Sequence, residues 1–82
     1  MKELTVIHCS QAYRFIGELL GKNRNTSMYK TIDGKFIIFE KWKDDEGSIS
    51  TYNTEAGLID DGEPQWILWA GLNLPEDKVT RL

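Results

Sequence analysis

The hydrophobic residues in the first part of the chain follow two different periods. Leu4 to Cys9 is rich in β-branched side chains, which is typical of a strand. The next apolar positions recur at intervals of three and four residues: Ala12, Phe15, Ile16, Leu19 and Leu20. This spacing predicts an α-helix over residues 11–20, with Ser10 as its N-cap and Gly21 just past its end.

The next segment has the pattern of a β-hairpin. Met28 to Ile32 is a candidate strand, and the following Asp33-Gly34 is a strong signal for a type I′ turn. Lys35 to Trp42 then forms the return strand. Because its apolar residues point to both faces, we expect a central strand that is covered on both sides.

The second half is more polar and more interrupted. Asp44 to Gly47 predicts a turn, and Ser48 to Thr54 predicts a polar edge strand. We expect Glu55 to Gln65, with its glycines, proline and acids, to form a long acidic loop. Trp66 to Ala70 has the character of a last apolar strand, and the tail from Pro75 is long enough for one helical turn.

Together these elements predict an α+β fold. The order is β-α-β-β-β-β, an antiparallel sheet of four to five strands with one helix packed on one face. A chain of 82 residues forms a single domain, residues 1–82, because a second core would not fit. One helix covers only part of such a sheet, so the opposite face is either solvated or available to a partner.

Composition supports a folded protein and reveals an uneven distribution of charge. The chain is 40% hydrophobic and 28% charged, unlike a disordered segment. Residues 1–43 hold eight Lys or Arg and four acids, a net +4, whereas residues 44–82 hold two and nine, a net −7. The asymmetry indicates either an interaction surface or two halves whose charges interleave in the fold.

The cysteine content and the hydropathy pattern predict a cytoplasmic protein. Cys9 is the only cysteine, so no disulfide can form within the chain. The uncharged stretch from Leu4 to Tyr13 is too short to span a membrane and lacks the features of a signal peptide. We therefore expect no membrane association.

Candidate catalytic groups are few. His8 and Cys9 are neighbours on a predicted strand, so their side chains should point to opposite faces and could not form a catalytic couple. One His and one Cys are also a poor basis for a zinc site. No phosphate-binding loop or dinucleotide fingerprint is present. We expect no catalytic residue, no cofactor and no metal.

Two acidic runs are candidates for binding a partner. Asp44-Asp45-Glu46 and Asp60-Asp61-Gly62-Glu63 lack the alternating ligand positions of a calcium loop, so we interpret them as acidic turns. Clustered carboxylates can also imitate a phosphate backbone and occupy a basic groove on another protein.

The tryptophans suggest a binding surface. If Trp66 and Trp69 lie on a strand, they face opposite sides of the sheet, and Trp42 must also be placed. We therefore expect at least one of the three to be exposed, because so small a core needs few such residues. The predicted partner-binding residues are Trp42, Asp44, Asp45, Glu46, Tyr52, Asp60, Asp61, Glu63, Trp66 and Trp69.

The favoured hypothesis is a small non-catalytic protein that acts as a stoichiometric inhibitor or adaptor of a larger protein or protein–nucleic-acid complex. By analogy of size and charge alone, it suggests an inhibitor encoded by a phage or mobile element, of the anti-defence or host-takeover type. The alternative is a nucleic-acid-binding module that uses the basic first hairpin, with Lys30, Lys35, Lys41, Trp42 and Lys43. A third possibility is a homodimer in which the uncovered sheet face pairs with itself.

Overall fold

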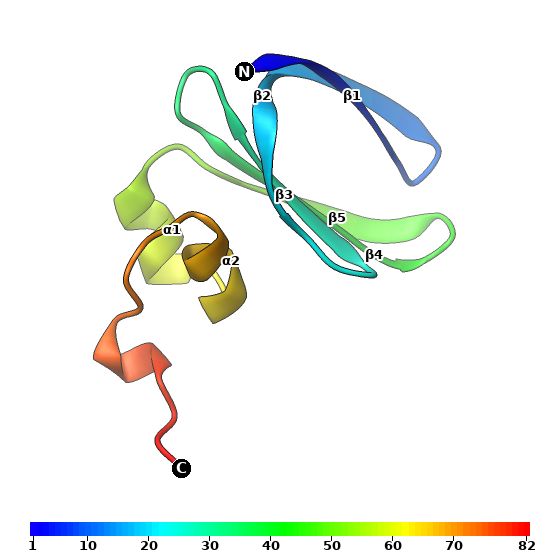
Figure 1. The fold of residues 1–82 in the computed structure, drawn as a ribbon. Coiled ribbons are helices and arrows are strands. Elements are labelled where there is room, and N and C mark those ends of the chain that lie inside the picture. The colour runs from blue at the N-terminus through cyan, green and yellow to red at the C-terminus, as the bar shows by residue number, and fades with distance from the viewer.

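The computed structural model describes all 82 residues as five strands followed by short helices (Figure 1). The strands are β1 (Lys2–His8), β2 (Gln11–Lys22), β3 (Thr26–Thr31), β4 (Phe36–Lys43) and β5 (Glu46–Tyr52). The α-helices are α1 (Glu55–Asp61) and α2 (Pro64–Trp69), and a 3-10 helix, η1, spans Glu76–Lys78. The predicted α+β class is confirmed.

The five strands form one antiparallel sheet in the order β1-β2-β3-β4-β5. Every strand therefore pairs with its neighbours in the sequence, and β1 and β5 are the two edges. The antiparallel meander and the polar edge strand at β5 are as predicted. The helices come after the sheet rather than inside it, and they lie together beside the part built from β3 to β5 (Figure 1).

The helix predicted over residues 11–20 is wrong, because this segment is the long strand β2. In its first half, alternate residues such as Tyr13 and Phe15 turn to one face of the sheet, while Ile16 points outward and is 45% exposed. Plain alternation puts Leu20 on the same face as Ile16, and there it packs against the main core. A β-bulge between Leu19 and Gly21 then brings Gly21 to this face as well, opposite Met28. The apolar spacing imitates that of a helix because β2 carries apolar residues on both faces.

Gly17 is where β2 passes from one partner strand to the other. It pairs with Lys2 of β1 and also with Thr31 of β3. A Cβ at Gly17 would collide with the backbone carbonyl of Lys30, so only glycine permits this approach. Beyond this point the β1–β2 hairpin curves over one face of the sheet (Figure 1). We call this curved part of the sheet the roll.

Each face of the sheet carries its own apolar cluster. The face toward the helices forms the main core: Met28, Phe36, Ile38, Leu58, Trp66 and Ile67. The face inside the roll holds an aromatic cluster: His8, Tyr13, Phe15, Tyr29 and Phe39. Phe36 is 1% exposed on the first face and Phe39 4% on the second, which confirms that β4 is covered on both sides.

Two elements of the second half differ from prediction. The segment expected to be an acidic loop contains α1. Thr54 is its N-cap, and the Thr54 hydroxyl accepts a hydrogen bond from the Gly57 amide at 3.0 Å. The segment expected to be a last strand lies in α2, which begins with Pro64 in its first turn. Trp66 and Trp69 are therefore one helical turn apart and share a face instead of lying on opposite sides.

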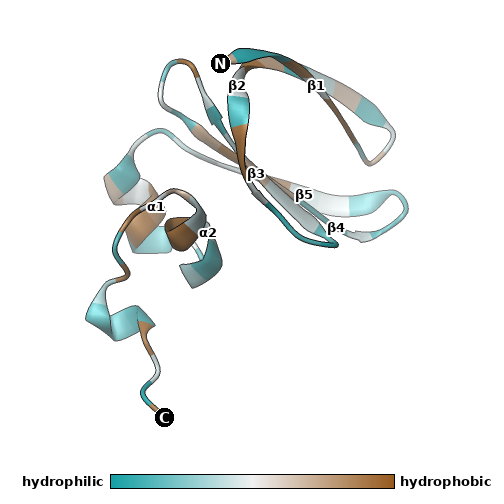
Figure 2. Ribbon diagram, viewed as in Figure 1, coloured by the Kyte–Doolittle hydropathy of each residue, from teal (hydrophilic) through white to brown (hydrophobic).

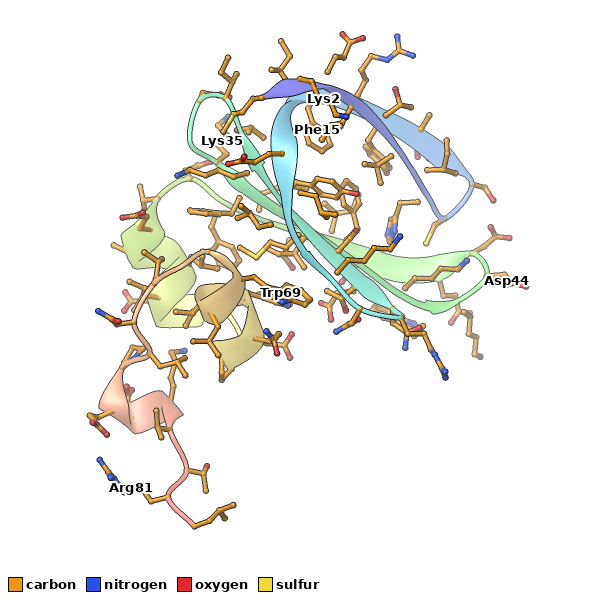
Figure 3. All side chains as sticks on the ribbon, in the orientation of Figure 1. Lys2, Phe15, Lys35, Asp44, Trp69 and Arg81 are labelled. Carbon is orange, nitrogen blue, oxygen red and sulfur yellow. The ribbon has the colours of Figure 1, made fainter.

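Trp69 attaches α2 to the sheet. A Cβ at Gly21 would overlap the Trp69 ring, so the indole rests directly on the backbone of β2. Figure 3 shows Trp69 pointing from α2 toward the strands. Figure 2 shows that the helices place hydrophobic residues against the sheet, whereas the turn between β2 and β3 is hydrophilic.

The turns also differ in type from the prediction. The type I′ geometry occurs at Cys9-Ser10, where both residues have positive φ (49° and 67°), although this dipeptide is no standard turn signal. At the predicted site only Gly34 has positive φ. There Thr31 and Lys35 close a three-residue loop through a 2.8 Å backbone hydrogen bond, so the hairpin is confirmed but its turn type is wrong.

The tail contains one short helical turn, as predicted. This is η1, and its Lys78 Nζ donates to the backbone carbonyls of Asp60 at 3.2 Å and of Gly62 at 3.3 Å. These bonds tie the tail to the end of α1.

Candidate partner-binding cleft

A cleft of about 380 Å³ opens between the end of β1 and the turn that joins β2 to β3. One wall is formed by residues 5–8 of β1 and the other by residues 22–27, while Tyr29, Phe39 and Lys41 complete the lining. The cleft exists because β2 bends at Gly17, which separates β1 from the second half of β2.

The charge of this cleft is opposite to that of the protein as a whole. Its lining includes Lys22, Arg24 and Lys41 but no acidic residue, although the chain carries a net charge of −3. The three ion pairs of the molecule involve Lys35, Lys43 and Arg81, so the cations of the cleft have no carboxylate partner. An anionic ligand would supply the missing charge.

The turn that carries Lys22 and Arg24 is fixed by its own hydrogen bonds. The Asn23 side-chain oxygen accepts from the backbone amides of Asn25 at 3.1 Å and Thr26 at 2.9 Å. The Lys41 amide of β4 donates to the Asn25 carbonyl at 2.8 Å. This wall of the cleft is therefore held in place before any ligand binds.

The floor of the cleft is formed by the aromatic cluster. The centroid of the Phe39 ring lies 5.8 Å from that of Tyr29 and 5.2 Å from that of His8. Phe15 packs edge-on against Tyr29 at 5.3 Å (its ring is labelled beneath β2 in Figure 3). The rings pack against one another, so the floor is apolar but shows little ring face to solvent.

The wall formed by β1 offers unpaired main-chain groups. In an antiparallel pair with a two-residue turn, the residues flanking the turn exchange hydrogen bonds, and every second residue beyond them does the same. With His8 opposite Gln11, the alternation leaves the amides and carbonyls of Thr5 and Ile7 pointing toward the free edge. Neither residue makes a backbone hydrogen bond outside the strands.

The prediction that His8 and Cys9 lie on opposite faces is wrong. Cys9 lies in the turn, and its left-handed backbone brings its sulfur to 3.6 Å from His8 Nε2. His8 is 8% exposed, and no hydrogen bond to a third group orients its ring. The thiol and the imidazole therefore lie within hydrogen-bond distance for sulfur, which the predicted strand placement had excluded.

The turn between β1 and β2 lies against the turn between β4 and β5. The Ser10 hydroxyl donates to a carboxylate oxygen of Asp45, and a Cβ at Gly47 would lie 3.0 Å from the His8 ring and 3.1 Å from the Cys9 sulfur. The β1–β2 turn thus rests on the β4–β5 turn, and the sheet is closed by side chains at this end.

The predicted acidic residues lie in two separate places. Asp44, Asp45 and Glu46 occupy the β4–β5 turn beside the cleft end of β1, where Glu46 pairs with Lys43 at 4.0 Å. Asp60, Asp61 and Glu63 lie at the junction of α1 and α2. No group of three or more His, Cys, Asp or Glu side chains is arranged to hold a metal ion.

The acids near α1 perturb two neighbouring groups. Burial, together with the hydrogen bond that its hydroxyl donates to Asp61 at 2.9 Å, raises the pKa of Tyr52 to about 12. Burial and the nearby charge of Glu63 raise the pKa of Glu40 above its usual value. Glu40, Asp61 and Glu63 therefore form a local cluster of negative charge on the helix side of the sheet.

One of the three tryptophans is available for contact. Trp42, at the bulge between Lys41 and Lys43, is 60% exposed, which confirms the expectation of an exposed tryptophan. Trp66 is 7% exposed, and Trp69 packs against the core. These two rings fill the interface between helices and sheet.

The basic residues of the first hairpin are not brought together. Lys30 lies over the Phe36 ring at 5.7 Å on the helix side, and Lys35 pairs with Asp33 at 3.9 Å at the far end of the hairpin. Of the five residues proposed for nucleic-acid binding, Lys41, Trp42 and Lys43 remain near the cleft.

Sequence reasoning missed several residues of the cleft. It placed Lys22 at a helix end, counted Arg24 only among the basic residues around the first hairpin, and assigned no role to the edge of β1. A run of two cations and two asparagines within Lys22–Asn25 was the only local signal. Its proximity to β1 follows from the bend at Gly17, which only the folded sheet reveals.

Comparisons with models of protein families, with curated proteins and with solved structures found no match. None of the helices has the length and apolar character needed to cross a membrane.

Proposed function

We propose that this protein is a small non-catalytic binding module that acts as a stoichiometric inhibitor or adaptor of a larger protein or protein–nucleic-acid complex. The observation that carries the proposal is Trp42, a large aromatic side chain of β4 that is 60% exposed. Tryptophan is enriched among the residues that dominate binding energy. Leaving it in solvent costs hydrophobic free energy that contact with a partner recovers.

The surroundings of Trp42 suit the rim of an interface. Lys41 and Lys43 flank it, and the acidic turn Asp44-Asp45 follows directly. An apolar anchor within polar and charged residues is the usual arrangement at protein–protein interfaces. The neighbouring cleft adds a concave surface of positive charge on the side of Lys41.

Site-specific photo-crosslinking tests this proposal with a matched control. A photoreactive phenylalanine analogue would replace Trp42 in one variant and Ile32 in another, because Ile32 is 66% exposed but lies in the turn before β4, at the other end of the hairpin. We expect irradiation in cells of the source organism to yield one discrete heterologous adduct from position 42 and none from position 32. Equal labelling at both positions, or an adduct only with another copy of this chain, would refute the proposal.

A nucleic-acid-binding module is the second candidate, supported by the unpaired cations of the cleft. Its test is retention on single-stranded DNA at increasing salt. We expect Lys41→Glu together with Lys43→Glu to abolish retention if this candidate is correct. Absence of salt-sensitive retention in the unaltered protein rules it out.

A further inference from the structure

We propose that the cleft binds an extended acidic segment of the partner, which adds as a sixth strand to the free edge of β1. This inference rests on the proposed protein-binding function and specifies the chemistry of the partner. Three independent features support it: the main-chain groups of β1, the charge of the cleft and an adjoining hollow along β1.

The main-chain groups favour an extended peptide. Thr5 and Ile7 each direct an amide and a carbonyl toward the free edge of β1 and into the cleft. Strand addition satisfies such groups, which supply affinity while pockets for alternate side chains supply specificity. Nothing in the chain covers this edge, since β1 is the first strand of the sheet.

The charge favours an acidic segment. A strand docked on β1 lies between that edge and the opposite wall, where Lys22 and Arg24 have no carboxylate partner. Lys41 adds a third unpaired cation at the end of β4. Glutamate or aspartate side chains on the added strand would therefore meet three cations without displacing an existing ion pair.

The cleft adjoins a second hollow along β1. This hollow of about 580 Å³ lies toward the start of β1, and its lining includes Met1, Leu4 and Leu19 together with Lys2 and Glu18. It shares Tyr29 with the cleft, so the two openings adjoin. The apolar residues of the second hollow suit every second residue of an added strand, while the residues between remain polar.

The same features argue against single-stranded nucleic acid as the occupant. Binding without sequence preference depends on aromatic faces onto which bases stack. Phe39 is 4% exposed and Tyr29 is packed between Phe15 and Phe39, so the floor presents few ring faces. The free β1 edge presents carbonyls as well as amides, and a phosphate backbone offers these carbonyls no donor, whereas a peptide strand bonds both.

The test uses a fluorescent seven-residue peptide, the length of β1, with valine and glutamate alternating. A peptide with lysine in place of glutamate and an oligothymidylate serve as comparison ligands. Binding is measured by fluorescence anisotropy at low ionic strength. We expect the glutamate peptide to bind and the lysine peptide to show no binding.

Proline substitutions separate strand addition from simple charge attraction. Thr5→Pro removes an edge-facing amide inside the cleft, whereas Thr5→Val keeps that amide and removes only the hydroxyl that accepts from Arg14. We expect Thr5→Pro to weaken peptide binding about tenfold, as for the loss of one hydrogen bond in a confined site, and Thr5→Val to have little effect. Arg24→Glu should weaken binding by a similar factor.

A measurement on the unaltered protein covers the case in which Thr5→Pro does not fold. Hydrogen exchange of the Thr5 and Ile7 amides should slow by at least about tenfold when the peptide is added in excess, because they become bonded. Peptide binding without this protection, equal binding of oligothymidylate, or no binding of the glutamate peptide would each overturn the inference. A crosslinked partner at Trp42 together with any of these results would leave the proposed function intact while refuting this mode of binding.

Discussion

The contact between Gly21 and Trp69 gives a sharp test of how the helices are held on the sheet. In the variant Gly21→Ala, the new Cβ would lie 2.5 Å from Trp69 Cε2 and closer still to two other ring atoms. Carbon atoms in contact are ordinarily about 3.5–4.0 Å apart, so the ring must retreat by more than about 1 Å. Because Gly21 is paired with the fully buried Met28, the backbone of β2 has little freedom to move instead.

The magnitude follows from the balance of two effects. Overpacking of this kind costs about 1–3 kcal/mol, and replacing a strand glycine by alanine returns roughly 0.5–1 kcal/mol. We therefore expect Gly21→Ala to lower the free energy of unfolding by about 1–2 kcal/mol. A domain of 82 residues has a total stability on the order of 4–12 kcal/mol, so the loss is easily measured.

A double-mutant cycle isolates the contact. Trp69→Ala removes the ring, and in that background Gly21→Ala should become neutral or stabilise by about 0.5 kcal/mol. Urea unfolding followed by circular dichroism measures all four proteins without relying on the fluorescence of the deleted tryptophan. If the two effects add to within about 0.5 kcal/mol, the ring does not rest on Gly21 and the reasoning is refuted.

Three further predictions follow from individual groups. Leu58→Ala should cost about 2–5 kcal/mol in urea unfolding, because Leu58 is fully buried between α1 and the sheet; a loss below about 1 kcal/mol would contradict its place in the core. The pKa of Tyr52 is about 12 in the folded protein, above its ordinary value. The contribution of Tyr52 to the free energy of unfolding should therefore be fully present below pH about 10 and should be lost as the pH rises toward 12. Absorbance of tyrosinate measures this pKa, which Asp61→Asn should lower; an ordinary value near 10 in the unaltered protein would contradict the reasoning. Cys9→Asn combined with Ser10→Gly should raise the unfolding free energy by about 0.5–1 kcal/mol, since both positions have positive φ, and a decrease would show that side-chain contacts dominate the turn.

Strands could be predicted wherever a segment carried only one hydrophobic pattern. The segments around β1, β3, β4 and β5 have β-branched or alternating residues bounded by turn signals, and the structure places strands there. The failure at β2 has a specific cause. Phe15 and Leu19 lie on one face of β2 and Ile16 and Leu20 on the other, so adjacent apolar pairs recur every four residues as they would in a helix. No local rule separates this pattern from a helix.

The helices were missed for a related reason. Trp66 and Trp69 are compatible with a strand if they face opposite sides, and with a helix if they face the same core. Pro64 at the start and the Thr54 cap were the signals that favoured helices. The cleft was beyond prediction, because it joins residues 5–8 to residues 22–27 through a bend that depends on one close approach at Gly17.

The open edge of β1 also bears on aggregation. An uncovered strand edge is a template on which identical chains can stack, and natural sheets guard such edges with charge. Here the charge comes from three cations in the cleft that have no carboxylate partner and face the edge: Lys22, Arg24 and Lys41. If two copies met edge to edge, these cations would be brought together and would repel. The charge that would attract an acidic strand therefore also opposes edge-to-edge pairing of two copies, and neutralising these cations would remove that protection.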